Sequence, residues 1–80
     1  MITYDGLMEF SDNYKEEWEK GNLNEFMDEL VELFTKYCVE YNVESDTAEC
    51  DCIMCDLADN MKIPNEYFEQ FYNTMVQNIV

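Results

Sequence analysis

The chain has no arginine and no histidine, and four lysines are its only basic side chains. Without histidine it has no imidazole to act as a general base, to activate a nucleophile or to bind a metal ion. Without arginine it lacks the planar group that clamps phosphates, and its two glycines form no phosphate-binding loop. The sequence therefore predicts a protein that is not an enzyme.

Long apolar runs are also missing. No stretch approaches the roughly 20 apolar residues that span a bilayer, and residues 1–5 have neither the basic region nor the apolar run of a signal peptide. An anionic surface is in addition repelled by anionic lipid. We expect a soluble protein in the cytoplasm of a bacterial host cell, with no membrane partner.

Acidic residues are abundant, because nineteen Asp and Glu against four Lys give a net charge of −15 on 80 residues. A small domain needs a net charge of only about 2 to 8 for solubility, and excess charge of one sign destabilises the compact state. Each lysine also has a carboxylate three or four residues away, which neutralises it locally. The excess predicts a basic partner, and most strongly basic surfaces in a cell bind nucleic acid.

Hydrophobic residues make up 48% of the chain, and five Phe, six Tyr and one Trp are available for a core. This composition favours one folded domain, residues 1–80, over disorder. Apolar residues recur at intervals of three and four, which is typical of helices. We therefore expect an all-α fold, a compact small bundle of three to four helices.

Glycine, proline and capping residues give the expected helix boundaries. The first helix is expected from about residues 3–5 to 20, with Leu7 and Trp18 on its apolar face and Gly21 as its cap. The second extends from a cap at Asn22 to about residues 41–43. The third begins at residues 45–47, with Asp46 and Glu49 resembling a capping box. The fourth begins at residues 64–65, and the alternation in residues 1–4 is weak evidence for a strand.

Four cysteines, Cys38, Cys50, Cys52 and Cys55, allow two interpretations. The Cys-x-x-Cys spacing of Cys52 and Cys55 is that of half a zinc site, which the other two thiolates would complete. Because a second such pair is lacking, we favour small apolar side chains buried where helices pack. Disulfides are not expected in a reducing cytoplasm, no segment has the pattern of an EF-hand calcium loop, and no cofactor is predicted.

Carboxylates that recur every three or four residues on a helix lie about 4.5–6 Å apart along its axis. Phosphates of one DNA strand are about 3.4 Å apart along the axis, so such rows would imitate a phosphate track. The alternative is an ordinary solvated face. The acidic residues that we predict to bind a basic partner are Glu25, Asp28, Glu29, Glu32, Glu40, Glu44, Asp46, Glu49, Asp51, Asp56 and Asp59. Six Tyr and Trp18 exceed what a small core must bury, so some are expected at a protein interface.

Residues 66–75 read Glu-Tyr-Phe-Glu-Gln-Phe-Tyr-Asn-Thr-Met. These ten residues are similar to an acidic Phe-Tyr-Asn-x-Met segment in an anti-CRISPR family that inhibits a CRISPR nuclease. The short acidic chain as a whole resembles phage-encoded inhibitors of host defence and other DNA mimics. The resemblance implies a class of behaviour, inhibition of a CRISPR effector or nuclease, and it assigns no role to an individual residue.

The sequence thus predicts a phage- or mobile-element-encoded inhibitor, a monomer or weak homodimer, that binds a basic nucleic-acid-binding host protein rather than nucleic acid itself. Two alternatives stay open. One is an immunity or antitoxin-like module that neutralises a basic partner protein, and the other is a small structural domain that binds a metal through four cysteines.

Overall fold

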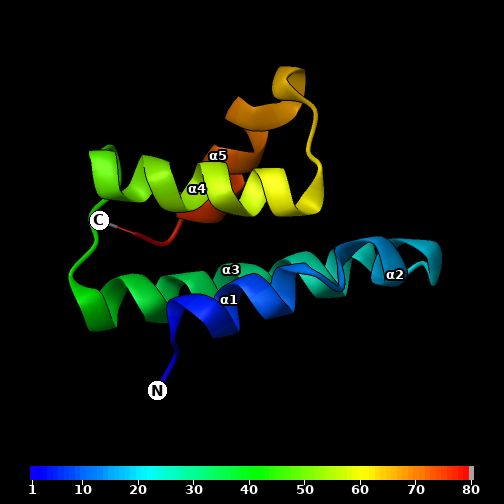
Figure 1. Cartoon of the computed structure of the whole chain (residues 1–80), viewed down its shortest axis with the longest axis horizontal. Coiled ribbons are helices and arrows are strands. Elements are labelled where there is room, and N and C mark those ends of the chain that lie inside the picture. Colours follow the sequence, from blue (N-terminus) through cyan, green and yellow to red (C-terminus); the bar gives the residue numbers. More distant parts are fainter. Residues whose placement is uncertain (80) are drawn as a thin grey trace.

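The computed structural model describes residues 1–79, which fold as a helical bundle (Figure 1). Its elements are α1 (Tyr4–Ser11), α2 (Tyr14–Glu19), α3 (Leu23–Tyr41), α4 (Ala48–Met61), the 3-10 helix η1 (Asn65–Tyr67) and α5 (Phe68–Val76). α1, α2 and α3 lie side by side, α4 lies across from them, and α5 lies behind α4 and against α3. The described residues contain no strand, so the prediction of a small all-α bundle is confirmed.

α3 and α4 supply most of the hydrophobic core. The buried residues of α3 are Phe26, Leu30, Val31, Phe34, Tyr37 and Cys38. Those of α4 are Cys50, Ile53, Met54, Leu57, Ala58 and Met61. α1 and α5 each pack against both helices and add Leu7, Phe71 and Met75. The apolar spacing in the sequence therefore predicts the core-facing side of both major helices.

The first predicted helix is wrong in one respect, because a turn at Asp12 and Asn13 divides it into α1 and α2. The Ser11 hydroxyl donates a hydrogen bond to the Met8 carbonyl at 2.7 Å. The Asn60 side-chain nitrogen of α4 lies 2.6 Å from Ser11 Oγ, 2.6 Å from Asp12 Oδ1 and 3.0 Å from the Met8 oxygen. Short polar side chains compete with helical backbone bonds in this way, and α4 holds the break in place.

The break also changes the environment of the residues that follow it. α2 buries none of its residues, and Trp18 is 60% exposed, so its predicted place on an apolar inner face is wrong. Tyr14, at the start of α2, keeps its contact with the core by packing edge-on against Phe26, with ring centroids 5.9 Å apart. Phe10 of α1 stacks on the same Phe26 ring at 4.9 Å.

Several predicted helix ends are confirmed, but two predicted caps differ from the structure. Asn22 lies at the N-cap position of α3, yet its side chain makes no capping hydrogen bond. Gly21 has the left-handed φ of 80° expected at the end of the first helical segment, and α3 ends at Tyr41, before Asn42 with φ of 56°. α4 is capped by Thr47, whose hydroxyl accepts a hydrogen bond from the Cys50 N–H at 3.2 Å. The predicted capping pair of Asp46 and Glu49 does not form, because Asp46 has a φ of 61° and lies before the cap.

Candidate acidic interface

The outer side of α3 carries a row of carboxylates opposite its buried residues. All of its members are exposed, and we call them the α3 acidic face: Glu25, Asp28, Glu29, Glu32 and Glu40. At about 3.6 residues per turn they fall within about 120° of the helix circumference, and at a rise of ~1.5 Å per residue they extend over about 22 Å. The arrangement is a narrow negative strip along the longest helix.

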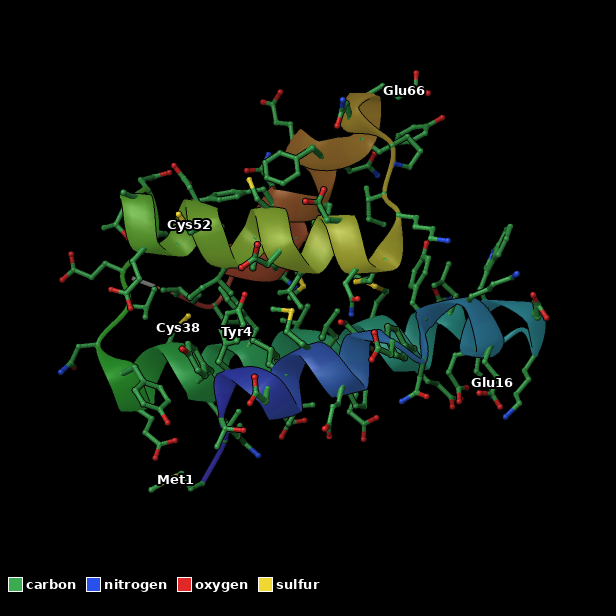
Figure 2. All side chains as sticks on the ribbon, in the orientation of Figure 1. Met1, Tyr4, Glu16, Cys38, Cys52 and Glu66 are labelled. Atoms are coloured by element: carbon green, nitrogen blue, oxygen red, sulfur yellow. The ribbon has the colours of Figure 1, made fainter. Side chains whose placement is uncertain are left out.

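The outer side of α4 is also acidic, but its carboxylates are less continuous. Glu49, Asp51, Asp56 and Asp59 are exposed, as are Cys52 and Cys55 between them. The Asp56 carboxylate accepts a hydrogen bond from the Tyr4 hydroxyl, and Tyr4 reaches from α1 toward α4 (Figure 2). This hydrogen bond, followed by burial, raises the pKa of Tyr4 to about 12. One of the four carboxylates of α4 therefore joins two helices.

The eleven predicted residues do not form a single face. α3 and α4 bury their inner sides in one core and lie across from each other (Figure 1), so their outer sides point in different directions. Glu44 and Asp46 are exposed in the connection between the two helices. Every predicted residue is accessible, yet a flat partner would contact the α3 acidic face or the α4 carboxylates, not both.

Most of these carboxylates are not neutralised. Three lysines form ion pairs one helical turn away, at nitrogen–oxygen distances of 3.1 Å for Lys20–Glu16, 3.2 Å for Lys36–Glu32 and 4.0 Å for Lys15–Glu19. Across residues 1–79, Glu32 is the single predicted interface residue within 4.0 Å of a lysine nitrogen. The local neutralisation predicted from spacing is confirmed for three lysines and is wrong for Lys62, which lies beyond 4.0 Å of every carboxylate oxygen among the described residues, and the α3 acidic face stays strongly negative.

Further exposed carboxylates are not among the eleven residues predicted to bind a basic partner. Asp5, Glu9, Asp12, Glu16 and Glu19 on and between α1 and α2 are exposed, and Glu16 points away from the bundle in Figure 2. Their spacing in the sequence was a usable signal, since all five follow each other at intervals of three or four residues.

The four cysteines separate into two pairs. Cys38 and Cys50 are buried, with Cys38 between α3 and α4 in Figure 2, whereas Cys52 and Cys55 are exposed. Burial raises the pKa of the Cys38 thiol to about 12 and also raises that of Cys50. The interpretation as buried packing residues thus holds for the first pair and is wrong for the second. No group of three or more potential ligands among residues 1–79 is arranged to hold a metal ion.

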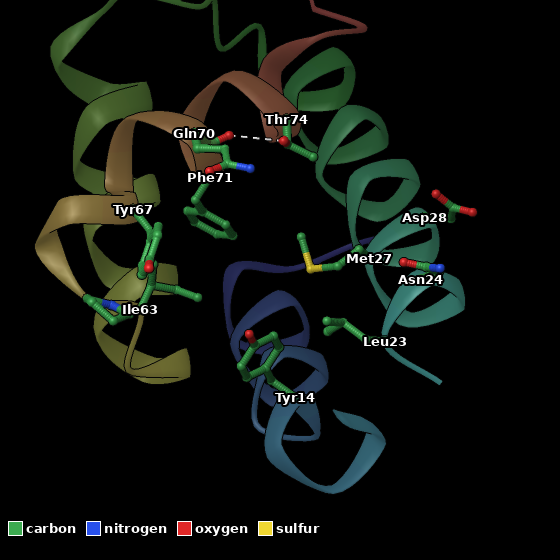
Figure 3. Close-up of a pocket in the computed structure, with 11 residues that line it drawn as sticks. Tyr14, Leu23, Asn24, Met27, Asp28, Ile63, Tyr67, Gln70, Phe71 and Thr74 are labelled. Carbon is green, nitrogen blue, oxygen red and sulfur yellow. Dashed lines mark hydrogen bonds between the residues drawn. The ribbon is translucent and has the colours of Figure 1, made fainter. Parts of the chain in front are cut away.

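The structure also shows a groove that the sequence did not predict. It lies between α3 and the segment from Ile63 through η1 into α5, with Tyr14 at one end, and has a volume of about 840 Å³ (Figure 3). Tyr67, which is 54% exposed, forms part of its wall. Tyr14 and Tyr67 are far apart in the sequence, so only the folded chain brings them to one site.

Comparison with protein-family models, with curated proteins and with solved structures finds no match to this chain. Among the described helices, none combines the length and the apolar character needed to cross a membrane.

Proposed function

We propose that this protein is an inhibitor that occupies a basic, nucleic-acid-binding surface of another protein and thereby excludes the nucleic acid. The observation that supports the proposal is the α3 acidic face, where five exposed carboxylates follow one helix and one of them is paired with a lysine. Over the same ~22 Å, one strand of DNA would carry about six phosphates. The charge density of the helix is thus comparable with that of a nucleic-acid strand.

The mechanism is competition by charge and by shape. A groove that binds phosphates is lined with Lys and Arg, and carboxylates of the α3 acidic face would pair with the same side chains. Such binding is steered by long-range attraction and weakens as salt screens the charges. In keeping with the resemblance of residues 66–75, the first targets to examine are CRISPR effectors and host nucleases, with the protein encoded by a phage or mobile element.

The proposal is tested with two variants of equal net charge. One carries Glu25→Gln, Glu29→Gln and Glu32→Gln on the α3 acidic face. The control carries Asp5→Asn, Glu9→Gln and Glu19→Gln, all of which are exposed and lie outside the eleven predicted residues. Tagged protein captures partners from a bacterial lysate at low salt, and the retained protein is then challenged with its own nucleic acid.

We expect nucleic acid to displace the protein from its partner, and the α3 variant to bind about tenfold more weakly, a loss of about 1.4 kcal/mol. The control variant should bind nearly as well as the natural chain. Equal binding by both variants, or simultaneous binding of nucleic acid and this protein to the partner, would contradict the proposal. A partner indifferent to nucleic acid is instead the result expected of an immunity or antitoxin-like module.

A further inference from the structure

The groove beside α3 has an apolar lining and an opening to solvent. Its apolar residues come from four elements and the connection that precedes η1: Tyr14, Leu23, Met27, Ile63, Tyr67 and Phe71. Figure 3 shows Met27 and Leu23 from α3 on one side, Tyr67 and Ile63 on the other, and Tyr14 at the end formed by α2. Aromatic residues and Met are enriched at the centres of protein interfaces, and the flexible Met side chain adapts to different occupants.

Carboxylates border this groove on two sides. Asp28 lines the groove itself and, with Glu32, an adjoining hollow along α3. Glu66 and Glu69 lie in a second hollow, which shares Gln70 with the groove. Within residues 1–79 no basic residue lines the groove, and Lys36 of the α3 hollow is paired with Glu32 at 3.2 Å. An apolar floor between negative rims is complementary to an occupant that is apolar along one side and positively charged along its flanks.

We propose that this groove binds a basic amphipathic helix of the partner protein, with apolar side chains one turn apart inserted between Met27 and Tyr67 and with Lys or Arg facing the two rims. The proposal deepens the proposed function and rests on it, because Asp28 and Glu32 belong both to the rim and to the α3 acidic face. The groove adds an apolar anchor, which charge alone does not supply, and anchors of this kind contribute most of the affinity at protein interfaces.

The shape of the groove favours a helix over an extended peptide. Its walls are helices and the connection at Ile63 and Pro64, so the described lining contains no strand edge for β-augmentation. The lining on α3 extends from Leu23 to Asp28, about 7.5 Å at ~1.5 Å per residue. That length accommodates two apolar side chains at positions i and i+4 of a docked helix, the usual pattern of helix-in-groove recognition. A second copy of this chain is a poor occupant, since each copy carries a net charge of −15.

The test uses a synthetic peptide of leucine and lysine, about 18 residues long so that it forms an amphipathic helix. An isomer of identical composition, with the sequence rearranged to abolish the apolar side, is the matched peptide. Affinity is measured by titration calorimetry at physiological salt, and the site is mapped by amide chemical shifts of the full chain. We expect the amphipathic peptide to bind about tenfold more tightly than its isomer, with the largest shifts at Met27, Tyr67 and Phe71.

A pair of variants tests the location without changing charge. Asn24 is an exposed groove residue, and Asn24→Trp fills the groove while removing no core contact. Val39 is 74% exposed on the same helix, about 22 Å away at ~1.5 Å per residue, so Val39→Trp is the control. We expect Asn24→Trp to weaken peptide binding about tenfold and Val39→Trp to leave it almost unchanged.

Equal affinity for both peptides, or shifts confined to the outer carboxylates of α3, would overturn the inference, because the groove would then add nothing to charge attraction. The same holds if Asn24→Trp binds the peptide like the natural chain. The experiment contains no nucleic-acid-binding protein, so this failure is distinct from that of the proposed function. Conversely, the chain could bind the peptide in the groove and yet fail to displace nucleic acid from a partner. That result would support the proposed helix-binding groove and contradict the proposed inhibitory function.

Discussion

α3 and α4 are both amphipathic helices with acidic outer sides, yet they are held in the bundle differently. α3 is held mainly by apolar packing, with α1, α2 and α5 all against it. α4 is also fastened by polar side chains from both neighbours. Tyr4 of α1 bonds to Asp56, and Asn60 bonds to the α1–α2 turn. The Tyr72 hydroxyl of α5 accepts from the Asp46 N–H at 3.0 Å and donates to the Cys50 thiol at 3.6 Å.

The difference bears on which acidic side is available to a partner. Apolar contacts hold α3 in the bundle. Among the described residues, the only outer carboxylate of α3 that hydrogen-bonds to another part of the chain is Glu40, which accepts from the Ile2 N–H at 3.3 Å. On α4, Asp56 is engaged in holding the fold, and thiols separate the remaining carboxylates. The comparison therefore favours α3 as the binding helix and α4 as part of the framework.

The largest expected effect is a loss of apolar packing in α3. Phe34 is completely buried, and Phe34→Ala should lower the free energy of unfolding by about 3–5 kcal/mol, because it removes apolar burial and leaves a cavity. Chemical denaturation followed by circular dichroism measures the change. Val39→Ala on the same helix is the control, since Val39 is 74% exposed, and its change should stay within about 0.5 kcal/mol. Similar losses for both would refute the central role of the inner side of α3.

The next effect concerns the polar attachment of α4. Asn60→Ala removes the nitrogen that contacts Met8, Ser11 and Asp12. Ser11 is 1% exposed, so its oxygen loses a donor that water does not readily replace, and we expect a cost of about 1–3 kcal/mol. The control is Asn73→Ala, an exposed position on α5, for which little change is expected. An Asn60→Ala protein as stable as the natural chain would mean that the turn between α1 and α2 forms without support from α4.

Phe34 and Asn60 also illustrate which features of the fold the sequence predicts and which it does not. The three-and-four spacing of apolar residues identifies the inner side of α3, including Phe34, because helical periodicity and burial are local in origin. The break at Asp12 is contacted by Asn60, 48 positions away, and no local pattern contains that contact. The division of the predicted acidic residues between two sides likewise depends on how the helices pack, as does the groove that joins Tyr14 to Tyr67.

The hydroxyls of Tyr4 and Tyr72, on the two sides of α4, predict that the free energy of unfolding falls at alkaline pH. The pKa of Tyr4 and that of Tyr72 are both raised to about 12, the first chiefly by its bond to Asp56 and the second chiefly by burial. An unfolded tyrosine has a pKa of about 10, so folding favours the neutral phenol. The resulting stabilisation is complete below about pH 10 and is lost as the pH rises from about 10 to 12.

Thermal unfolding between pH 9 and 12 tests this expectation, with a falling midpoint above pH 10. Tyr4→Phe combined with Tyr72→Phe removes the two phenols that bond to residues of α4 and of the connection before it, and should make the decline less steep. Part of the decline should remain, because burial also raises the pKa of the Cys38 thiol to about 12 and raises those of Cys50 and Tyr37. An unchanged pH profile in the double variant would show that the hydroxyls do not fasten α4.

The smallest expected effect is at the carboxyl ends of the two helices, where the backbone has the same shape but different residues. Asn42 follows α3 with φ of 56° and Lys62 follows α4 with φ of 58°. The left-handed conformation is unfavourable for Lys, tolerated by Asn and free for Gly. Lys62→Gly should therefore raise the free energy of unfolding by about 0.5–1 kcal/mol, and Asn42→Gly should raise it less. Chemical denaturation measures both, with Lys62→Ala as the control that removes the charge without relieving the backbone. If Lys62→Ala and Lys62→Gly are equally stable, the lysine charge at the helix end, rather than its backbone conformation, determines the effect of this position.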